Sequence, residues 1–197
     1  MIDWLNQLLD VRSLIEWGAI PGITLIIFVE TGLFLGFFLP GDSLLVTAGI
    51  LAAAGDLNLI ALLIFPSLAA IIGDQTGYVI GRKAGSALSS HYPRFGKKID
   101  RAHAFYEKYG AKTIVLARFV PVVRTFVPAV AGAARMNYRT FVTYNVFGGV
   151  LWVFSTSLLG YTVGSLIPDI DRYLHVVIGV VVVLSILPAV FEWYKHR

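Results

Sequence analysis

A nearly uncharged run from Tyr138 to Pro168 constrains this chain more than any other feature, because its single charged residue, Arg139, stands at its start. A helix needs about 20 consecutive apolar residues to cross the hydrocarbon core of a bilayer, and this run is longer. Of the 197 residues, 57% are hydrophobic and only 14% are charged, with a mean hydropathy of +0.75. Soluble domains carry about 25% charged residues. The sequence therefore predicts an all-α integral membrane protein with a spanning helix over 138–167.

Two further spanning helices are predicted over 57–81 and 173–192, the first on the condition that Asp74 is tolerated near one end. The uncharged stretches elsewhere are too short to cross, and two regions contain helix breakers: Pro40 with Gly41, and Pro121 with Pro128. Non-helical backbone is tolerated at membrane depth only where protein buries it. We therefore predict two re-entrant helical hairpins, over 20–55 and 112–136, with tips at Pro40, Gly41 and Pro121.

The basic residues are placed very unevenly along the chain. Of the 16 Lys and Arg residues only Arg12 precedes Arg82, and eight of them crowd the region from Arg82 to Lys112. The positive-inside rule makes the basic segment 86–111 cytoplasmic. If hairpin 112–136 enters and returns, Arg135 and Arg139 are cytoplasmic as well. The acidic segment 1–18 is then expected on the opposite face, as an interfacial helix.

Part of the basic segment is amphipathic. Ile99, Ala102, Tyr106 and Tyr109 recur at helical spacing among basic residues. Such a helix is suited to lie at the membrane interface against anionic headgroups. A solvated linker helix with one charged face is the alternative.

A short sequence echo follows the two predicted hairpins. The span after the first ends in GYVIG, from Gly77 to Gly81, and the span after the second ends in GYTVG, from Gly160 to Gly164. Interrupted segments at matching positions of two halves are typical of inverted-repeat transporters, whose substrate site lies where the broken helices meet. A single five-residue match can also arise by chance, because Gly is frequent in membrane helices.

Opposite charges stand on the two predicted hairpins: Glu30 and Asp42 on the first, Arg118 and Arg124 on the second. Unpaired charges are costly in an apolar setting, so these groups are expected to pair, to hold a charged ligand or to change protonation state. Arg presents a planar fork of donors that suits phosphate. The alternative is a pair of salt bridges that only staple one hairpin to the other.

Other polar residues give weaker indications. Asp74, in GDQTGY, is a possible accessory residue that can either snorkel to the interface or hydrogen-bond a neighbouring helix. The chain has no cysteine and no histidine pair at ligand spacing, so neither a metal site nor a cofactor is expected. The four Trp residues, Trp152 among them, are interpreted as interfacial anchors or lipid-facing bulk.

Three stretches carry a family resemblance: FVETGLFLGFFLPGDSLLVTAG, GDQTGYVIGRKAG and FYEKYGAKTIVLARFVPVVRTFVPAVAGAARM. In this order they resemble the DedA family, also called VTT or SNARE-associated membrane proteins, from about Ile20 to Gly164. The resemblance implies a multi-pass bacterial inner-membrane protein with two opposed re-entrant hairpins, associated with lipid transport between leaflets, notably of undecaprenyl phosphate, and with the proton motive force. The family's acidic pair falls on Glu30 and Asp42, and its arginine pair on Arg118 and Arg124. Some members have Pro-Ser-Glu where this chain has Pro40, Gly41 and Asp42, which leaves the subgroup and the lipid open.

The expected function is a non-enzymatic flippase for a lipid phosphate, with Arg118 and Arg124 binding the phosphate and Glu30 and Asp42 carrying the coupling proton. Its expected partners are membrane lipids, either undecaprenyl phosphate or phospholipid, and protons; no nucleic acid is expected, and the oligomeric state is left open. The alternatives are a broad-specificity phospholipid scramblase or a proton/cation antiporter. A membrane phosphatase would need a nucleophile with a positioned base, and no His lies near the arginines in the sequence.

Overall fold

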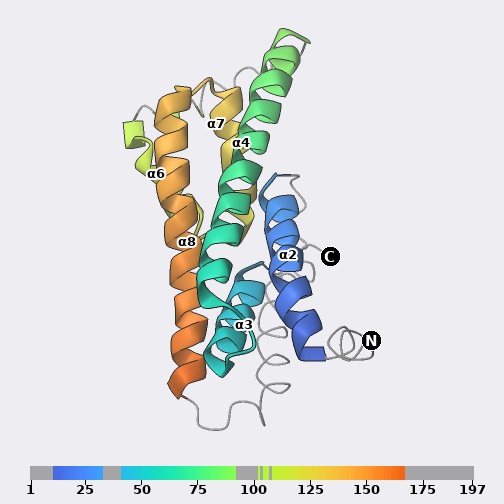
Figure 1. The fold of residues 1–197 in the computed structure, drawn as a ribbon. Coiled ribbons are helices and arrows are strands. Elements are labelled where there is room, and N and C mark those ends of the chain that lie inside the picture. Colours follow the sequence, from blue (N-terminus) through green and yellow to red (C-terminus); the bar gives the residue numbers. More distant parts are fainter. Residues whose placement is uncertain (1–10, 33–40, 92–101, 103, 107, 167–197) are drawn as a thin grey trace, which may run out of the picture. The chain divides into compact units, whose positions relative to one another are not determined.

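The structure is a computed structural model that describes residues 11–32, 41–91, 102, 104–106 and 108–166. Throughout these ranges the regular elements are helices (Figure 1). Their bounds are α2 Val11–Gly32, α3 Gly41–Ala54, α4 Leu59–His91, α6 Lys112–Ala117, α7 Pro121–Ala133 and α8 Tyr138–Leu166. The predicted span over 173–192, the tip residue Pro40 and residues 1–10 of the predicted interfacial helix lie outside the described residues.

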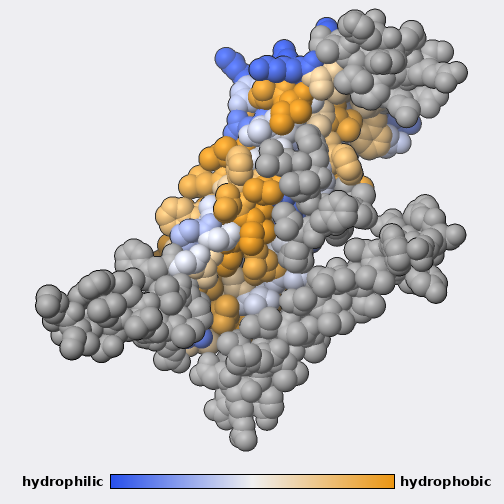
Figure 2. Space-filling view, turned by 90° about the vertical axis from the view of Figure 1, so that its right-hand side faces the viewer, coloured by the Kyte–Doolittle hydropathy of each residue, from blue (hydrophilic) through white to orange (hydrophobic). Residues whose placement is uncertain are grey.

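Within the described ranges two helical stretches are long and apolar enough to cross a membrane, Leu59–Gly85 of α4 and Tyr138–Leu166. They agree with the spans predicted over 57–81 and 138–167. Helix α4 continues to His91, beyond the predicted end, because no proline follows the span until Pro93. Large apolar side chains are exposed along both helices, for example Ile60 (68% exposed) and Phe147 (62%). In Figure 2 hydrophobic residues form a band along the middle of the coloured part of the surface, as expected for a protein surrounded by lipid.

The chain forms two compact units, and each gathers segments that are distant in the sequence. Unit 1 comprises Met1–Ile26, Pro40–Ser67 and Val153–Arg197, and unit 2 comprises Ile27–Leu39 and Leu68–Trp152. Helices α2, α4 and α8 each contribute residues to both units.

In unit 1, helix α3 packs closely on the C-terminal half of α8 (Figure 1). A Cβ added at Gly160 would overlap the backbone of Val46, and one at Gly49 would overlap the backbone carbonyl of Ser157. A Cβ at Gly164 would lie 2.8 Å from the Cβ of Ala53. Glycines at these positions let the two helix backbones approach, as in small-residue contacts of membrane helices.

In unit 2, helix α7 packs in the same way on the C-terminal half of α4. A Cβ at Gly81 would overlap the backbone of Ala129, and one at Gly132 would overlap the carbonyl of Tyr78. The Tyr78 ring stacks on Phe141 of α8, with ring centroids 4.5 Å apart, and its hydroxyl donates to the Met136 carbonyl. With Ile114 and Ala131 these rings form a buried core cluster.

The sequence echo therefore corresponds to a repeated packing arrangement. Gly81 of GYVIG and Gly160 of GYTVG each face the backbone of a short helix, α7 and α3 respectively. Gly81 is the last residue of its motif, whereas Gly160 is the first residue of its own. The two equivalent helix contacts are therefore shifted by one helical turn relative to the alignment of the two motifs. The echo marks a helix contact that both units use.

The breaks in the second hairpin region are only partly as predicted. Pro121 is the first residue of α7, where its missing N–H costs nothing, and residues 118–120 join α6 to α7. Pro128 lies inside α7 and does not end it. At the first hairpin region, Gly41 is the first residue of α3, and Asp42 stands in the first turn of that helix.

Candidate functional site: a buried cluster of charges

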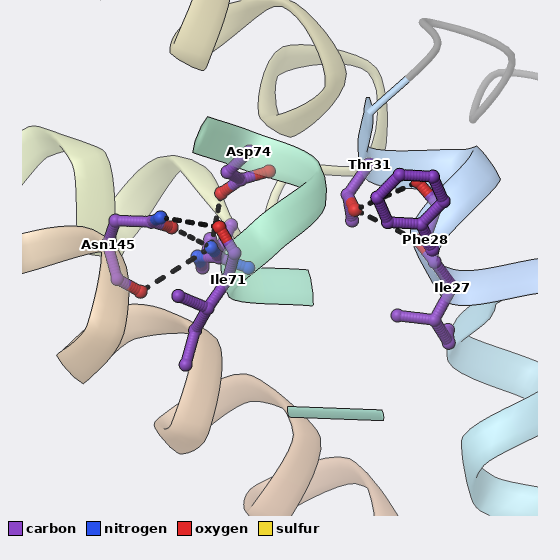
Figure 3. A network of polar contacts seen from close by, with 7 residues as sticks. Ile27, Phe28, Thr31, Ile71, Asp74 and Asn145 are labelled. Carbon is purple, nitrogen blue, oxygen red and sulfur yellow. Dashed lines mark hydrogen bonds and ion pairs between the residues drawn. The ribbon is translucent and has the colours of Figure 1, made fainter. Parts of the chain in front are cut away.

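Arg118, at the end of α6, is buried inside unit 2 and contacts two other helices. Its Nη2 donates to the Oδ2 of Asp74 on α4 and to the Oδ1 of Asn145 on α8, and it lies 3.5 Å from the Asn145 carbonyl oxygen. The Nδ2 of Asn145 donates to the carbonyl of Ile71, 3.0 Å away. Figure 3 shows Asp74 and Ile71 on α4 between Asn145 on one side and Thr31 of α2 on the other.

Two adjacent glycines of α8 make room for the Arg118 side chain. A Cβ at Gly148 would lie 3.1 Å from the Cδ of Arg118 and 3.2 Å from its Nε, and one at Gly149 would lie 3.4 Å from Nη2. The Nε of Arg118 is buried and has no hydrogen-bond partner among the described residues. A buried donor without an acceptor is destabilising by about 1–3 kcal/mol, so this N–H is available to an incoming acceptor.

A second ion pair joins Glu30, near the end of α2, to Arg124 in the first turn of α7. The Nη2 of Arg124 donates to the Oε1 of Glu30, and both side chains are buried, at 8% and 1% exposure. The guanidinium of Arg124 also lies over the ring of Trp152 on α8, with its Cζ 4.7 Å from the ring centroid. This distance is within the range of a cation–π interaction.

The two ion pairs belong to one cluster. Helix α2 meets α4 at Gly73, where a Cβ would overlap the hydroxyl of Thr31 and lie 3.1 Å from the Gly32 nitrogen. Glu30 and Asp74 directly adjoin this contact in the sequence. Both arginines lie against α8 within about one turn, at residues 148–149 and 152. We refer to Glu30, Asp74, Arg118 and Arg124, together with Asn145 and Trp152, as the charge cluster.

The structure therefore brings together three of the four charged residues named first from the sequence, and it adds a fourth. Arg118 pairs with Asp74, which the sequence suggested only as an accessory residue. Asp42 belongs to unit 1, whereas the charge cluster belongs to unit 2. Of the predicted tip residues, Gly41 and Pro121 each begin a helix.

Sequence reasoning missed the parts of the site that α8 supplies. The interpretation of Trp152 as an interfacial anchor or lipid-facing residue is wrong: Trp152 is 1% exposed and in contact with Arg124. Asn145 is fully buried and was not singled out at all. A signal was present, because a carboxamide within a membrane span is expected to face the protein interior and to hydrogen-bond a neighbouring helix.

The cluster holds positive and negative groups in equal number inside a membrane protein. Each carboxylate neutralises one guanidinium, and removing one partner would leave a buried charge uncompensated. A guanidinium binds phosphate as readily as carboxylate, through the same parallel N–H donors. An anion that displaced either carboxylate would therefore leave that carboxylate to take up a proton or to find another partner.

Helices with lipid-exposed apolar faces and a buried charge cluster define a polytopic membrane protein with a polar interior site. Residues 39–162 match the VTT domain family. Protein DedA of Escherichia coli K12 is 48% identical over 178 residues, covering 88% of this chain and 81% of that protein. An uncharacterized membrane protein of Mycobacterium tuberculosis is 45% identical (87% and 77% covered), and the E. coli inner membrane protein YqjA is 33% identical (84% and 76%). No solved structure matches the chain. The chain belongs to the DedA family and is an inner-membrane protein.

Proposed function

We propose that this protein is a flippase that moves a lipid phosphate of the undecaprenyl phosphate class between the leaflets of the inner membrane, coupled to the proton motive force. The observation that carries the proposal is the charge cluster, in which two buried arginines each hold a carboxylate that a phosphate can replace. Membrane-buried ionisable residues usually line substrate or proton pathways, which supports a transport role over a purely structural one.

Competition for the arginines links the substrate to the proton. When a lipid phosphate binds Arg118 or Arg124, the displaced carboxylate loses its counter-charge in an apolar setting and binds a proton. When the phosphate leaves, the carboxylate releases the proton and pairs again. The unpartnered Nε of Arg118 supports this step, because it offers the phosphate a donor that no carboxylate uses.

We assign phosphate binding to Arg118 and Arg124 and proton coupling to Glu30 and Asp42. Asp74 joins them as a coupling acid, because it is the carboxylate that pairs with Arg118. The proposal includes re-entrant hairpins over 20–55 and 112–136, which would bring non-helical backbone and charges to membrane depth without exposing them to lipid. The shortness of the apolar helices Gly41–Ala54 and Val123–Ala133 supports this arrangement.

A broad-specificity phospholipid scramblase and a proton/cation antiporter are the competing functions. A scramblase would show no dependence on a pH gradient, and an antiporter would need no lipid. Two arginines favour a phosphate ligand over a cation. Their planar N–H donors match phosphate oxygens, and their positive charge repels cations.

Reconstituted vesicles test the proposal directly. The rate of leaflet exchange of labelled undecaprenyl phosphate is measured with and without a pH gradient. Phosphatidylcholine that carries the same label is measured in parallel as the comparison. We expect the protein to accelerate the exchange of undecaprenyl phosphate but not that of phosphatidylcholine. A pH gradient should increase the rate for undecaprenyl phosphate further. Equal exchange of both lipids, independent of the gradient, would establish the scramblase, and no exchange of either would remove lipid transport.

Lysine substitutions test the phosphate-binding role. Arg118→Lys and Arg124→Lys keep the charge but lose the planar fork, so each is expected to slow exchange by about tenfold or more. Arg139→Lys, at an exposed position on α8, is the matched control and should transport normally. Normal transport by all three variants would show that the arginines supply net charge only.

A further inference from the structure

An open apolar groove of about 440 Å³ lies in unit 2, between α7 and the helical residues that precede α6. Phe105, Val123, Phe126 and Val130 line it, and each is 39–48% exposed. The volume falls within the range of about 300–1,000 Å³ that is typical of ligand sites. The groove shares no residue with the charge cluster.

A more polar hollow of about 210 Å³ adjoins this groove, because Tyr106 lines both. Its other lining residues include Arg135, Asn137 and Thr140, which lie between the end of α7 and the first turn of α8. The two spaces together pass from an apolar side to a side that carries a cation and neutral hydrogen-bonding groups. This order matches an amphiphile with an anionic head.

Arg135 occupies a backbone position that ordinarily belongs to glycine. Helix α7 ends in a Schellman motif, in which the N–H of Met136 donates to the Ala131 carbonyl and the N–H of Arg135 to the Gly132 carbonyl, each at 3.0 Å. Arg135 has a φ of 55°, and it alone among the described non-glycine residues has a positive φ. The negative end of α7 accounts for a nearby basic residue but not for one in the left-handed conformation. The side chain at this strained position therefore points to a binding role.

Arg135 and Tyr106 are the groups that can turn to a phosphate, because the side-chain oxygen of Asn137 already accepts from the N–H groups of Arg139 and Thr140. Arg135 is exposed, and among the described residues no carboxylate pairs with its guanidinium. The hydroxyl of Tyr106 lies 3.5 Å from the Val127 carbonyl oxygen, at the outer limit of a hydrogen bond. Burial raises the pKa of Tyr106 to about 12, so the phenol is a neutral donor at every physiological pH.

We propose that the groove and the hollow form a binding site for one anionic glycerophospholipid, with an acyl chain along Phe105, Phe126 and Val130 and the phosphate held by Arg135 and the Tyr106 hydroxyl. The occupant is a lipid because the lining belongs to a membrane protein, and an anionic one because the hollow presents a guanidinium. The site would hold the segment before α6 against α7 at the membrane surface. It is independent of the transport function proposed above.

Native mass spectrometry of the detergent-solubilised full chain tests this site. Phosphatidylglycerol and phosphatidylcholine with identical acyl chains are titrated separately, and the dissociation constant of the first bound lipid is measured. We expect one phosphatidylglycerol to bind about tenfold more tightly than phosphatidylcholine. Equal affinities would overturn the proposal, because the groove would then be ordinary lipid-facing surface.

Arg135→Gly separates binding from folding, since glycine is preferred at that backbone position. The variant is expected to melt at the same temperature as the wild type or higher, and to lose the preference for phosphatidylglycerol. Arg135→Gln provides the same test without changing backbone freedom. Arg139→Gln removes an equal charge outside the hollow and should keep the preference. If Arg139→Gln weakens phosphatidylglycerol binding as much as Arg135→Gly does, the lipid is attracted by the overall positive charge, and the proposed site does not exist.

Two further variants test the groove, one with a larger side chain that fills it and one with a photoreactive side chain. Val130→Trp, on α7, would fill the groove and should weaken phosphatidylglycerol binding at least fivefold. Leu159→Trp, at an exposed apolar position on α8, should not weaken it. A benzophenone amino acid in place of Phe126 should crosslink to the lipid upon illumination. Unchanged binding by Val130→Trp, or crosslinking to a second copy of the chain in place of lipid, would overturn the proposal.

Discussion

The carboxylate of Glu30 accepts a hydrogen bond from the guanidinium of Arg124 across 94 positions of sequence. The pair connects the end of α2 to the first turn of α7, and Trp152 of α8 lies over the guanidinium. Three helices thus meet at one buried charge pair. Its stability and its protonation can be tested separately.

Breaking this pair from either side should be strongly destabilising. Glu30→Ala and Arg124→Ala each leave a buried charge without its partner, so each should lower the free energy of unfolding by about 3–5 kcal/mol. The double variant should lose clearly less than the sum of the two, because it leaves neither charge alone. The free energies of unfolding of the wild type, the two single variants and the double variant are measured in detergent micelles, with Lys83→Ala as a control at an exposed position. Strictly additive losses would mean that the two side chains do not interact.

Neutralising Glu30 without changing its shape should act on coupling more than on folding. In Glu30→Gln the carboxamide oxygen still accepts from Arg124, so we expect appreciable folded protein in the membrane. The variant cannot exchange a proton, and its lipid exchange should no longer respond to a pH gradient. Vesicle assays of Glu30→Gln, Asp42→Asn and Asp74→Asn in parallel identify the coupling acid. If all three respond like the wild type, proton coupling does not involve these acids.

Asn145 should prove structural to the Arg118 pair. Asn145→Leu keeps the number and branching of the side-chain heavy atoms but removes the acceptor for Arg118 and the donor to the Ile71 carbonyl. Each buried group left unsatisfied costs about 1–3 kcal/mol, so the melting temperature should fall. Thr143→Leu, exposed on the same helix, should leave it unchanged. Equal melting of the two variants would contradict the hydrogen-bond network of Arg118.

The glycines at the two helix crossings should be intolerant of any side chain. Gly81→Ala and Gly160→Ala place a Cβ against the backbone of α7 and α3 respectively, and each should destabilise by about 1–3 kcal/mol. Gly22→Ala is the control, since a Cβ there meets nothing within 4 Å, and it should be neutral or stabilise by up to about 1 kcal/mol. Thermal unfolding ranks the three, and a tolerated alanine at both crossings would rule out the close packing.

Cysteine labelling tests whether 112–136 returns to the side from which it enters. The chain has no native cysteine, so single cysteines at Lys83 and Arg139, both exposed, can be labelled cleanly with an impermeant maleimide. We expect both to react from the cytoplasmic side. A cysteine at Asp169, between the spans predicted over 138–167 and 173–192, is the control, because one crossing by 138–167 should place it on the side opposite to Arg139. Reaction of Lys83 and Arg139 from opposite sides would mean that 112–136 crosses the membrane.

Hydrophobicity predicted the two candidate spans in α4 and α8, because each carries its signal within one continuous stretch. The pairing of Glu30 with Arg124 could be anticipated only as one of several options, since any buried acid satisfies any buried arginine. The partner of Arg118 depends on which helices lie opposite α6, and Gly148 contributes to this by letting α8 approach the backbone of α6 at Val115. Close approach has no signature in a single sequence beyond the glycines themselves.

The contact between Gly49 on α3 and Gly160 on α8 has a consequence for biogenesis. The partner surface of α3 is synthesised about 110 residues later, which corresponds to roughly 5–20 s at typical translation rates of about 5–20 residues per second. During that interval the apolar helix α3 lacks α8 as a packing partner. A nascent chain of this protein therefore needs either the insertion machinery or surrounding lipid to shelter α3, and truncation before α8 should send the product to proteolysis.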